Sequence, residues 1–227
     1  MTTTQLSPTP RTTVTRGRSR AVLDRDALHA VLAQGLVAHL GLATPGGHPL
    51  VLPSAYAVDP SGPDAGGTLY VHGSVAAGWV RAAADATVCV TVTLLDGLVA
   101  GRSAFHHSMN YRSAVVIGTA RVVDDAAEKE RALGLVVDHM IPGRSATLRA
   151  HTRKELAATA VIAVPLEEAS LKIRGGGPVD EPDDVEAGVW GGHVPLRLVA
   201  GDPVPDADAV TSGGPVPPDV VARARAL

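Results

Sequence analysis

Two short clusters in the sequence combine residue types that could bind an anion. The first is Tyr70-Val71-His72-Gly73-Ser74, in which a strand-like run is followed by a glycine and then a serine. If Ser74 begins a helix, the free amides of the first helical turn and the serine hydroxyl could hold a phosphate group. An ordinary helix cap without any ligand would use the same residues. The cluster therefore indicates a candidate anion site without identifying its ligand.

The second cluster, Asn110-Tyr111-Arg112-Ser113, places a cation beside an aromatic ring and a hydroxyl. An arginine side chain forms paired hydrogen bonds to phosphate or carboxylate groups, and a tyrosine ring can stack on a planar ligand. The same residues would also suit the start of an ordinary surface strand. We therefore treat this cluster as a second candidate binding site.

Histidines are the next candidates for chemistry. His106 and His107 are adjacent, and neighbours on an extended segment point to opposite sides, so they seldom bind one metal ion together. Spacing does not join them to another ligand, and we expect no metal site. The histidines that only the fold could bring to this pair are His39, His48, His72 and His193.

His72 and His107 are also the candidates for a catalytic role. An imidazole side chain can donate or accept a proton near neutral pH, which suits it to protonate or position a substrate. Each of them could equally be held by a backbone carbonyl with no part in catalysis. The identity of the catalytic residues therefore stays open at this point.

Common catalytic and nucleotide-binding motifs are absent from the sequence. It has no Gly-x-Ser-x-Gly and no His-Glu-x-x-His, and its glycine runs at 46–47 and 175–177 fit neither a P-loop nor a dinucleotide-binding pattern. The single cysteine, Cys89, excludes an internal disulfide and a multi-cysteine metal site. Because Cys89 lies in an apolar strand-like run, we expect a buried, unreactive side chain.

Several short strands, with helices beside them, must position these residues. Apolar periodicity and turn residues predict a mainly β, antiparallel barrel with attached helices, which differs from a doubly wound sheet. Ser74 is expected to cap a short helix that contains Trp79. The expected helices are 24–35, 74–85, 124–139 and 152–156, and the expected strands are 36–42, 48–58, 68–73, 87–95, 111–123, 158–165 and 170–174.

Length and composition set the outer limits. The chain has 227 residues, a formal net charge of −3 and 45% hydrophobic residues, which fits one domain with a substantial core. The charge gives no reason to expect nucleic acid or a membrane surface as partner, and aromatic residues, at 3%, are too few for a base-stacking platform. With no apolar run of membrane-spanning length, a cytoplasmic protein is expected. We divide the chain into a flexible tail (1–20), a domain (21–175) and an extended arm packed on it (176–227), with flexible last residues.

The order of motifs along the chain resembles the FMN-binding split-barrel superfamily, in the pyridoxamine 5'-phosphate oxidase-like branch that includes nitroimidazole-resistance reductases. The resemblance runs from about Asp24 to about Pro205 and rests on the ordered set rather than on any one motif. The segments that carry it are Gly35-Leu36-Val37-Ala38-His39-Leu40-Gly41, His48-Pro49-Leu50-Val51-Leu52-Pro53-Ser54, Leu69-Tyr70-Val71-His72-Gly73-Ser74, the run from His106 to Ala120, and Val189-Trp190-Gly191-Gly192-His193-Val194-Pro195.

The resemblance implies a homodimer of six-stranded antiparallel split barrels, with two flavin sites at the subunit interface and each site lined by both chains. It also implies FMN as cofactor and a small-molecule substrate. Trp79 is included among the cofactor residues, although it could equally be a core or interface residue. The implied cofactor-binding residues are Leu52, Pro53, Ser54, His72, Gly73, Ser74, Trp79, Tyr111, Arg112 and Ser113.

One departure from the family pattern concerns the flavin phosphate. Relatives usually carry a Ser-Arg or Arg-Lys pair just after the His-Gly-Ser turn, whereas this chain has Val75-Ala76-Ala77-Gly78-Trp79. Loss of a cation that binds phosphate costs about 2 kcal/mol, which weakens binding more than tenfold. Arg81, Arg102 or Arg112 could compensate for it.

The resemblance implies an oxidoreductase that takes electrons from a reduced nicotinamide and passes them through FMN to a small planar acceptor. A non-catalytic module that binds a flavin or another ligand on the same fold is the alternative, because fold alone does not prove activity. A deazaflavin, or haem bound through a histidine, remains a less favoured choice of cofactor. We do not expect the pyridoxamine 5'-phosphate oxidase reaction itself, because the substrate-phosphate residues of that enzyme have no counterparts here.

Overall fold

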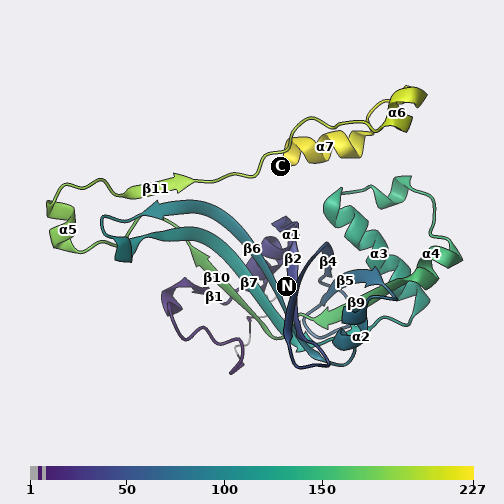
Figure 1. The fold of residues 1–227 in the computed structure, drawn as a ribbon, viewed down its shortest axis with the longest axis horizontal. Coiled ribbons are helices and arrows are strands. Elements are labelled where there is room, and N and C mark those ends of the chain that lie inside the picture. Colours follow the sequence, from purple (N-terminus) through teal and green to yellow (C-terminus); the bar gives the residue numbers. More distant parts are fainter. Residues whose placement is uncertain (1–4, 7–8) are drawn as a thin grey trace.

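The structure is a computed structural model that describes residues 5–6 and 9–227. Its strands pair antiparallel in two sheets with helices around them, which confirms the mainly β class expected from the sequence (Figure 1). The seven-stranded sheet has the order β1-β10-β7-β6-β2-β3, with β11 paired to β6, and the four-stranded sheet has the order β4-β5-β9-β8. The bounds are β1 Ala21–Val22, β2 Ala38–Ala43, β3 Pro49–Ser54, β4 Tyr56–Asp59, β5 Thr68–Ser74, β6 Thr87–Ala100, β7 Ser108–Thr119, β8 Arg121–Val122, β9 Thr159–Pro165, β10 Ala169–Arg174 and β11 Gly192–Pro195.

The single strand expected over residues 48–58 is divided between the two sheets. Its first part, β3, forms an edge of the seven-stranded sheet, and its second part, β4, pairs with β5 in the other sheet. Pro49 and Pro53 lie in β3. Proline has no amide proton to donate to a neighbouring strand, so it is tolerated at a sheet edge and poorly elsewhere. The bend at Ala55 therefore carries the chain from one sheet to the other.

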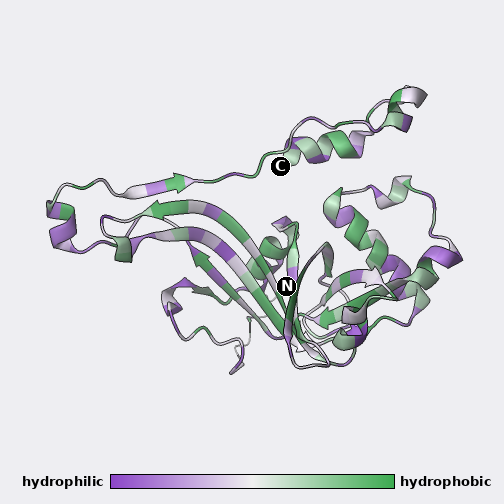
Figure 2. Cartoon of the chain, viewed as in Figure 1, coloured by the Kyte–Doolittle hydropathy of each residue, from purple (hydrophilic) through white to green (hydrophobic). Residues whose placement is uncertain are grey.

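The main core lies between the two sheets. Alternate residues of the strands point into it, so that Leu40, Val90 and Val116 are almost fully buried there. Figure 2 shows hydrophobic and hydrophilic bands following one another along the long strands. A smaller cluster forms on the outer side of the four-stranded sheet. There Tyr70 and Val161 pack under the helix that contains Ala132. The two faces of β5 therefore serve two different clusters, which fixes the direction of each side chain along that strand.

Four helices attach to the sheets. The helix that contains Arg25–Gln34 (α1) begins after Asp24, whose side chain accepts a hydrogen bond from the Asp26 amide, as expected. The long helix α3, Ala126–Met140, is capped by Asp125, one residue later than the sequence suggested. The helix α4, Arg153–Ala158, has a capping box, and the remaining one, α2, spans Gly78–Ala83.

A long hairpin made of β6 and β7 projects from the rest of the molecule (Figure 1). Its pairing runs from Thr87↔Thr119 to Val99↔Ser108, well beyond the strand expected over 87–95, and the tip carries the 3-10 helix η2, Ala104–His106. Local pairing of adjacent segments explains this length, because the two strands need only the short loop at the tip to join them.

The chain beyond β10 runs out along this hairpin and back again. It contains α5 (Pro182–Glu186), then β11, which pairs with β6 from Gly192↔Ala100 to Pro195↔Gly97, then α6 (Ala207–Ser212) and α7 (Pro218–Ala226). We call residues 176–227 the C-terminal arm. Contacts near α3 hold its end, where Arg223 donates to the His139 carbonyl at 3.4 Å.

The N-terminal segment expected as a flexible tail lies partly outside the described residues. In the part that is described, Leu6 is buried and its amide donates to the Leu23 carbonyl at 2.8 Å. Two 3-10 helices complete the chain, η1 at Arg18–Arg20 and η3 at Ser145–Thr147. Among residues 5–6 and 9–227, no helix combines the length and the apolar character needed to cross a membrane.

Candidate functional site

The first predicted cluster comes together at one end of the two sheets. Tyr56 of β4 pairs with Val71 of β5, so the residues just before Tyr56 and those just after Val71 lie at the same end. The predicted residues that meet here are Leu52, Pro53 and Ser54 from β3, and His72, Gly73 and Ser74 from β5.

Trp79 joins this group from α2. A Cβ atom at Gly73 would lie 2.5 Å from Cζ2 of the Trp79 indole, so the glycine allows the ring to lie directly on the strand. The indole also packs against the main core, with part of its surface accessible. Trp79 therefore fixes α2 against β5 and presents an aromatic edge beside the cluster.

The expectation that Ser74 begins the helix is wrong. Ser74 is the last residue of β5, and α2 begins at Gly78 after a turn, with Ala77 as an N-cap that makes no side-chain hydrogen bond. The turn amides already have partners: Val75 N donates to the Ala158 carbonyl at 3.1 Å and Ala76 N to Ser74 Oγ at 3.2 Å. Because these amides are satisfied within the chain, the cradle of free amides expected at Ser74 does not form.

The second predicted cluster lies elsewhere in the same chain. Tyr111, Arg112 and Ser113 are on β7, which is separated from β3 by β6 and β2. Three strand spacings amount to roughly 14 Å. Within one chain, β2 and β6 therefore lie between the two clusters.

The cations that could replace the missing phosphate-binding pair differ in the ion pairs that they already form within the chain. Arg112 forms a two-point ion pair with Asp96, at 3.0 Å from Nε to Oδ2 and 2.8 Å from Nη2 to Oδ1. Arg102 forms a hydrogen-bonded ion pair with Asp180, 2.7 Å from Nη1 to Oδ2, at the hairpin tip. Arg81 is exposed on α2 and has no ion pair to any described residue. Arg81 is thus an exposed cation close along the chain to the first cluster, and it is available to a ligand.

The two candidate catalytic histidines are in different surroundings. His72 has a buried Nδ1 with no hydrogen-bond partner among the described residues, and burial lowers the pKa of its imidazole. It lines a cavity of about 210 Å³ together with His151, Glu155 and the α3 side chains above them. His107 is exposed near the hairpin tip, where its Nδ1 lies 3.0 Å from the Ser103 carbonyl oxygen. The fold therefore does not bring His72 and His107 together.

A larger cavity, of about 880 Å³, lies where β2, β6 and β7 meet the C-terminal arm. Its polar wall includes His39 and Arg112, and its apolar wall includes Leu94, Leu196 and Leu198. His39 of β2 pairs with Pro53 of β3, so the cavity adjoins the first cluster. Sequence reasoning missed this cavity, because its walls come from segments about a hundred residues apart and no local motif marks them.

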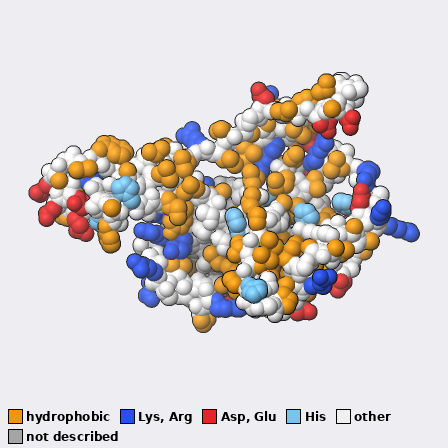
Figure 3. Space-filling model, viewed as in Figure 1, with side chains coloured by type: hydrophobic (Ala, Val, Ile, Leu, Met, Phe, Trp, Pro, Cys, Tyr) orange, Lys and Arg blue, Asp and Glu red, His pale blue; other side chains and the backbone are white. Residues whose placement is uncertain are grey.

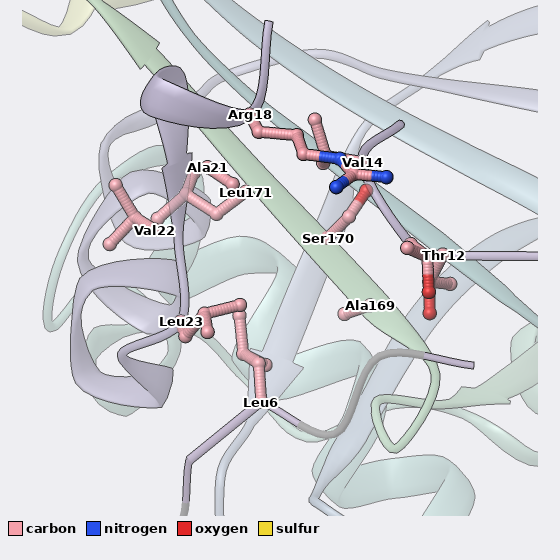
Figure 4. A pocket seen from close by; sticks show the side chains of 11 residues that line it. Leu6, Thr12, Val14, Arg18, Ala21, Val22, Leu23, Ala169, Ser170 and Leu171 are labelled. Atoms are coloured by element: carbon pink, nitrogen blue, oxygen red, sulfur yellow. The ribbon is translucent and has the colours of Figure 1, made fainter. Parts of the chain in front are cut away.

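A third cavity, of about 360 Å³, lies under the N-terminal segment (Figure 4). Its lining includes Leu6, Val22, Leu23 and Leu171, and the Arg18 side chain extends toward Val14 and Ser170. This lining has no group suited to acid–base or redox chemistry. Within the described part of the chain, no group of three or more histidine, cysteine, aspartate or glutamate side chains has the geometry to hold a metal ion.

The model of the pyridoxamine 5'-phosphate oxidase family matches residues 24–173, which include both predicted clusters. The chain belongs to this family. The match covers more than half of the sequence and confirms the family expected from the order of its motifs. No protein with a curated description is similar enough to count as a match.

Solved structures of this type include two that resemble the whole chain. The flavocytochrome Anf3 from Azotobacter vinelandii has 35% sequence identity and a TM-score of 0.86, with 95% of this chain and 97% of that chain covered. An FAD and haem binding protein from Mycobacterium smegmatis has 39% identity and a TM-score of 0.81, with 90% of this chain and 97% of that chain covered. Both similarities extend beyond the family match into the C-terminal arm.

A more distant structure confirms the fold alone. It is a candidate 5-nitroimidazole antibiotic resistance protein from Bacteroides thetaiotaomicron, with 21% identity, a TM-score of 0.55, and coverage of 67% of this chain and 86% of that chain. The antiparallel split-barrel fold expected for the family is thus shared by proteins of quite different sequence.

Proposed function

We propose that this protein binds a flavin and passes electrons through it from a reduced nicotinamide to a small planar acceptor. The observation that carries the proposal is the family match over residues 24–173, which spans both predicted clusters. The relative from Mycobacterium smegmatis, described as binding FAD and haem, supports the same choice of cofactor class. A bound flavin would supply the redox chemistry itself, and the protein would supply binding, orientation and exclusion of water.

The flavin we propose is FAD in place of the FMN expected from the sequence. The terminal phosphate of FMN is a monoester with close to two negative charges at neutral pH, and it needs a cation beside it. Each phosphate of FAD carries one charge, which suits a turn that lacks the Arg/Lys pair and has Arg81 as its available cation. The accessible part of the Trp79 indole offers an apolar contact for an adenine ring.

The complete site in this proposal belongs to a homodimer. One chain separates β3 from β7 by three strand spacings, so Tyr111, Arg112 and Ser113 would reach the flavin of the other subunit. Hydrophobic side chains gather on the surface of the projecting hairpin and arm, where a second chain would cover them (Figure 3). The exposed apolar residues of these segments include Leu98, Phe105, Met109, Trp190 and Val194. Apolar exposure of this extent is typical of an interface.

Two of the chain's own residues then have defined tasks. Pro53 and its neighbours on the β3 edge would lie along the flavin ring, where the lack of an amide proton at proline leaves an apolar contact surface. His72, neutral near pH 7 because burial lowers its pKa, would hold or accept a proton at its unpartnered Nδ1. Hydride transfer between nicotinamide and flavin needs no further acid or base from the protein.

Haem is a second cofactor that we propose for this protein. The observation that favours it is the cavity of about 880 Å³ beside β3, whose lining combines a histidine and arginines with leucine side chains. Haem is an apolar disc with two carboxylates and an iron that takes a histidine ligand. The leucine side chains suit the disc, the arginines suit the carboxylates and the histidine suits the iron. The relatives described as a flavocytochrome and as an FAD and haem binding protein support the proposal.

The test begins with the visible spectrum of purified protein, before and after FAD or FMN is added and excess flavin is removed by gel filtration. Flavin retained in proportion to protein supports the flavin proposal, and chromatography of the released cofactor decides between FAD and FMN. Absence of bound flavin at saturating FAD and FMN overturns it. Consumption of reduced nicotinamide above that of free flavin separates the oxidoreductase from a non-catalytic binding module.

A further inference from the structure

The large cavity between the barrel and the C-terminal arm is a built space with fixed walls. On the barrel side, β2 contributes His39 and β6 contributes Thr93, Leu94 and Asp96. On the arm side, the Leu196 amide donates a hydrogen bond to the Asp96 carbonyl at 2.9 Å, which holds the arm where it leaves β11. The cavity wall formed by the arm is therefore anchored at the strand that forms the opposite wall.

His39 is the group in this cavity that can bind a metal centre. Its side chain is exposed toward the cavity, and no hydrogen bond to either ring nitrogen is formed by the described residues. An imidazole with a free nitrogen is the usual protein ligand of haem iron. Because neighbouring positions on β2 pair with β3 and β6 on both sides, the backbone of His39 is held rigidly.

The charges of the cavity suit the carboxylates of the same ligand. Arg197, on the arm, lines the cavity and has no ion pair to the described residues. Arg112 lies in the same wall, where Asp96 and the side-chain oxygen of Gln34, at 2.6 Å, fix its guanidinium. A carboxylate placed at Arg197 would gain a charge-assisted hydrogen bond, while Arg112 would present an oriented but largely neutralised group.

Other histidines offer poorer geometry for a group of this size. His72 and His151 share a cavity of about 210 Å³, roughly a quarter of the volume at His39. A ring nitrogen of His107 and one of His139 already face backbone carbonyls, at 3.0 and 2.6 Å. The ring of His139 also packs on Tyr56, with ring centroids 4.6 Å apart.

We infer that His39 is an axial ligand of a haem bound in this cavity, with Arg197 holding one of its carboxylates. The inference rests on the haem function proposed above and assigns it to named residues. Because His39 pairs directly with Pro53, with Cα atoms about 5 Å apart in an antiparallel pair, the haem would lie beside the strand proposed to carry the flavin. The two cofactors would then be close enough to exchange electrons directly.

The experiment compares His39→Gly with His48→Gly as a matched control. His48 is an exposed histidine in the turn before β3 that lines none of these cavities. Full-length proteins are expressed with haem precursor, stripped of haem, and titrated with haemin while the Soret band is followed. Retained flavin in each variant reports on folding and on the flavin site, independently of haem.

The expected result is a Soret band at stoichiometric haemin in the unmodified chain and in His48→Gly. In His39→Gly the haemin affinity should fall by more than the roughly tenfold that loss of an outer-shell partner costs, and added imidazole should restore the band. Arg197→Gln should weaken haemin binding while leaving the position of the Soret band unchanged, because it removes a contact to a carboxylate and leaves the iron ligand in place.

Two results overturn the ligand assignment. The first is a His39→Gly variant whose haemin titration matches that of His48→Gly. The second is loss of both flavin and haem in His39→Gly without rescue by imidazole, which would assign this side chain to the flavin site or to the fold. Failure of the unmodified chain to bind haemin while it still binds flavin would overturn the haem function itself, and is thus distinct from the other two.

Discussion

Single charged groups decide how this protein can hold an anionic cofactor. Arg102 and Arg112 each face a carboxylate within hydrogen-bonding distance, whereas Arg81 does not. Sequence alone could name these three arginines but could not rank them. The pairing of β6 with β7 brings Asp96 to Arg112, and the path of the chain after β10 brings Asp180 to Arg102. Local features were easier: the cap at Asp24 depends only on residues within one turn and was predicted correctly.

Arg81→Gln should weaken flavin binding about tenfold or more, because it removes the available cation near the first cluster. Fluorescence quenching of FAD on titration with protein measures the affinity. Arg20→Gln is the matched control, since Arg20 is an exposed arginine beside β1, at the edge of the seven-stranded sheet opposite β3. Equal affinities in the two variants would remove Arg81 from the site.

Three partly buried histidines should make stability depend on pH. Burial lowers the pKa of His29, His72 and His139 in the folded chain, so below about pH 6.5 the unfolded state binds more protons than the folded state. The free energy of unfolding should therefore fall as pH falls through this range. Urea unfolding between about pH 7.5 and pH 5.5 measures the slope.

His139→Gln isolates one of these contributions. The amide of glutamine can still donate to the Gly35 carbonyl that faces His139 Nε2, but it does not titrate. In the variant, the free energy of unfolding should change less steeply with pH, because one fewer group titrates differently in the folded and unfolded states. A slope identical to that of the unmodified protein would mean that His139 takes up its proton equally in both states.

Among the helices and strands, the local pattern of apolar and turn residues predicted most elements correctly. The elements that were predicted wrongly are those whose bounds depend on pairing with distant strands. The strand expected at 48–58 was divided because Pro53 favours a sheet edge and the chain turns at Ala55 into the second sheet. The helix start at Ser74 was misplaced because β5 continues to that residue in register with Thr159 of β9. Both errors fall within or beside the first cluster, where β3, β5 and α2 meet.

Gly73→Ala tests how α2 is seated against β5. Its Cβ would lie 2.5 Å from the Trp79 ring, so the indole and the helix must shift, which we expect to cost about 1–3 kcal/mol and to weaken flavin binding. Thermal unfolding and flavin titration measure the two effects. Gly175→Ala is the control, because a Cβ there meets nothing within 4 Å. A Gly73→Ala protein with unchanged flavin affinity would place the flavin away from Trp79.

The whole molecule gains a complete site only when distant surfaces are combined. The arm supplies one wall of the largest cavity described, and the proposed homodimer supplies β7 of one chain to β3 of the other. Neither arrangement can be predicted from local sequence, because each depends on where a distant segment lies in the folded molecule. The resemblance to a family could suggest the dimer but gave no indication of the cavity beside His39.

Complementation between two defective chains tests the shared site. We expect Pro53→Arg and Ser113→Arg each to abolish flavin binding in their own homodimers, because each places a long charged side chain in one half of every site. A mixed dimer should regain one flavin, since one of its sites combines the unaltered β3 of one chain with the unaltered β7 of the other. Flavin content of dimers isolated through two different affinity tags measures this. Mixed dimers without flavin would contradict a site built from both chains.

The anchoring of the arm on β6 also sets an order in time. The strand β10 leaves the ribosome about twenty residues before Leu196, whose amide donates to the Asp96 carbonyl, and synthesis at roughly 5–20 residues per second separates the two by about one to four seconds. During this interval the barrel can fold while the space beside His39 still lacks its outer wall. The proposed haem could therefore enter from the open side during synthesis, and the last part of the chain would then close over it. Loading and final folding would be one event, and cofactor supply would limit the yield of closed protein.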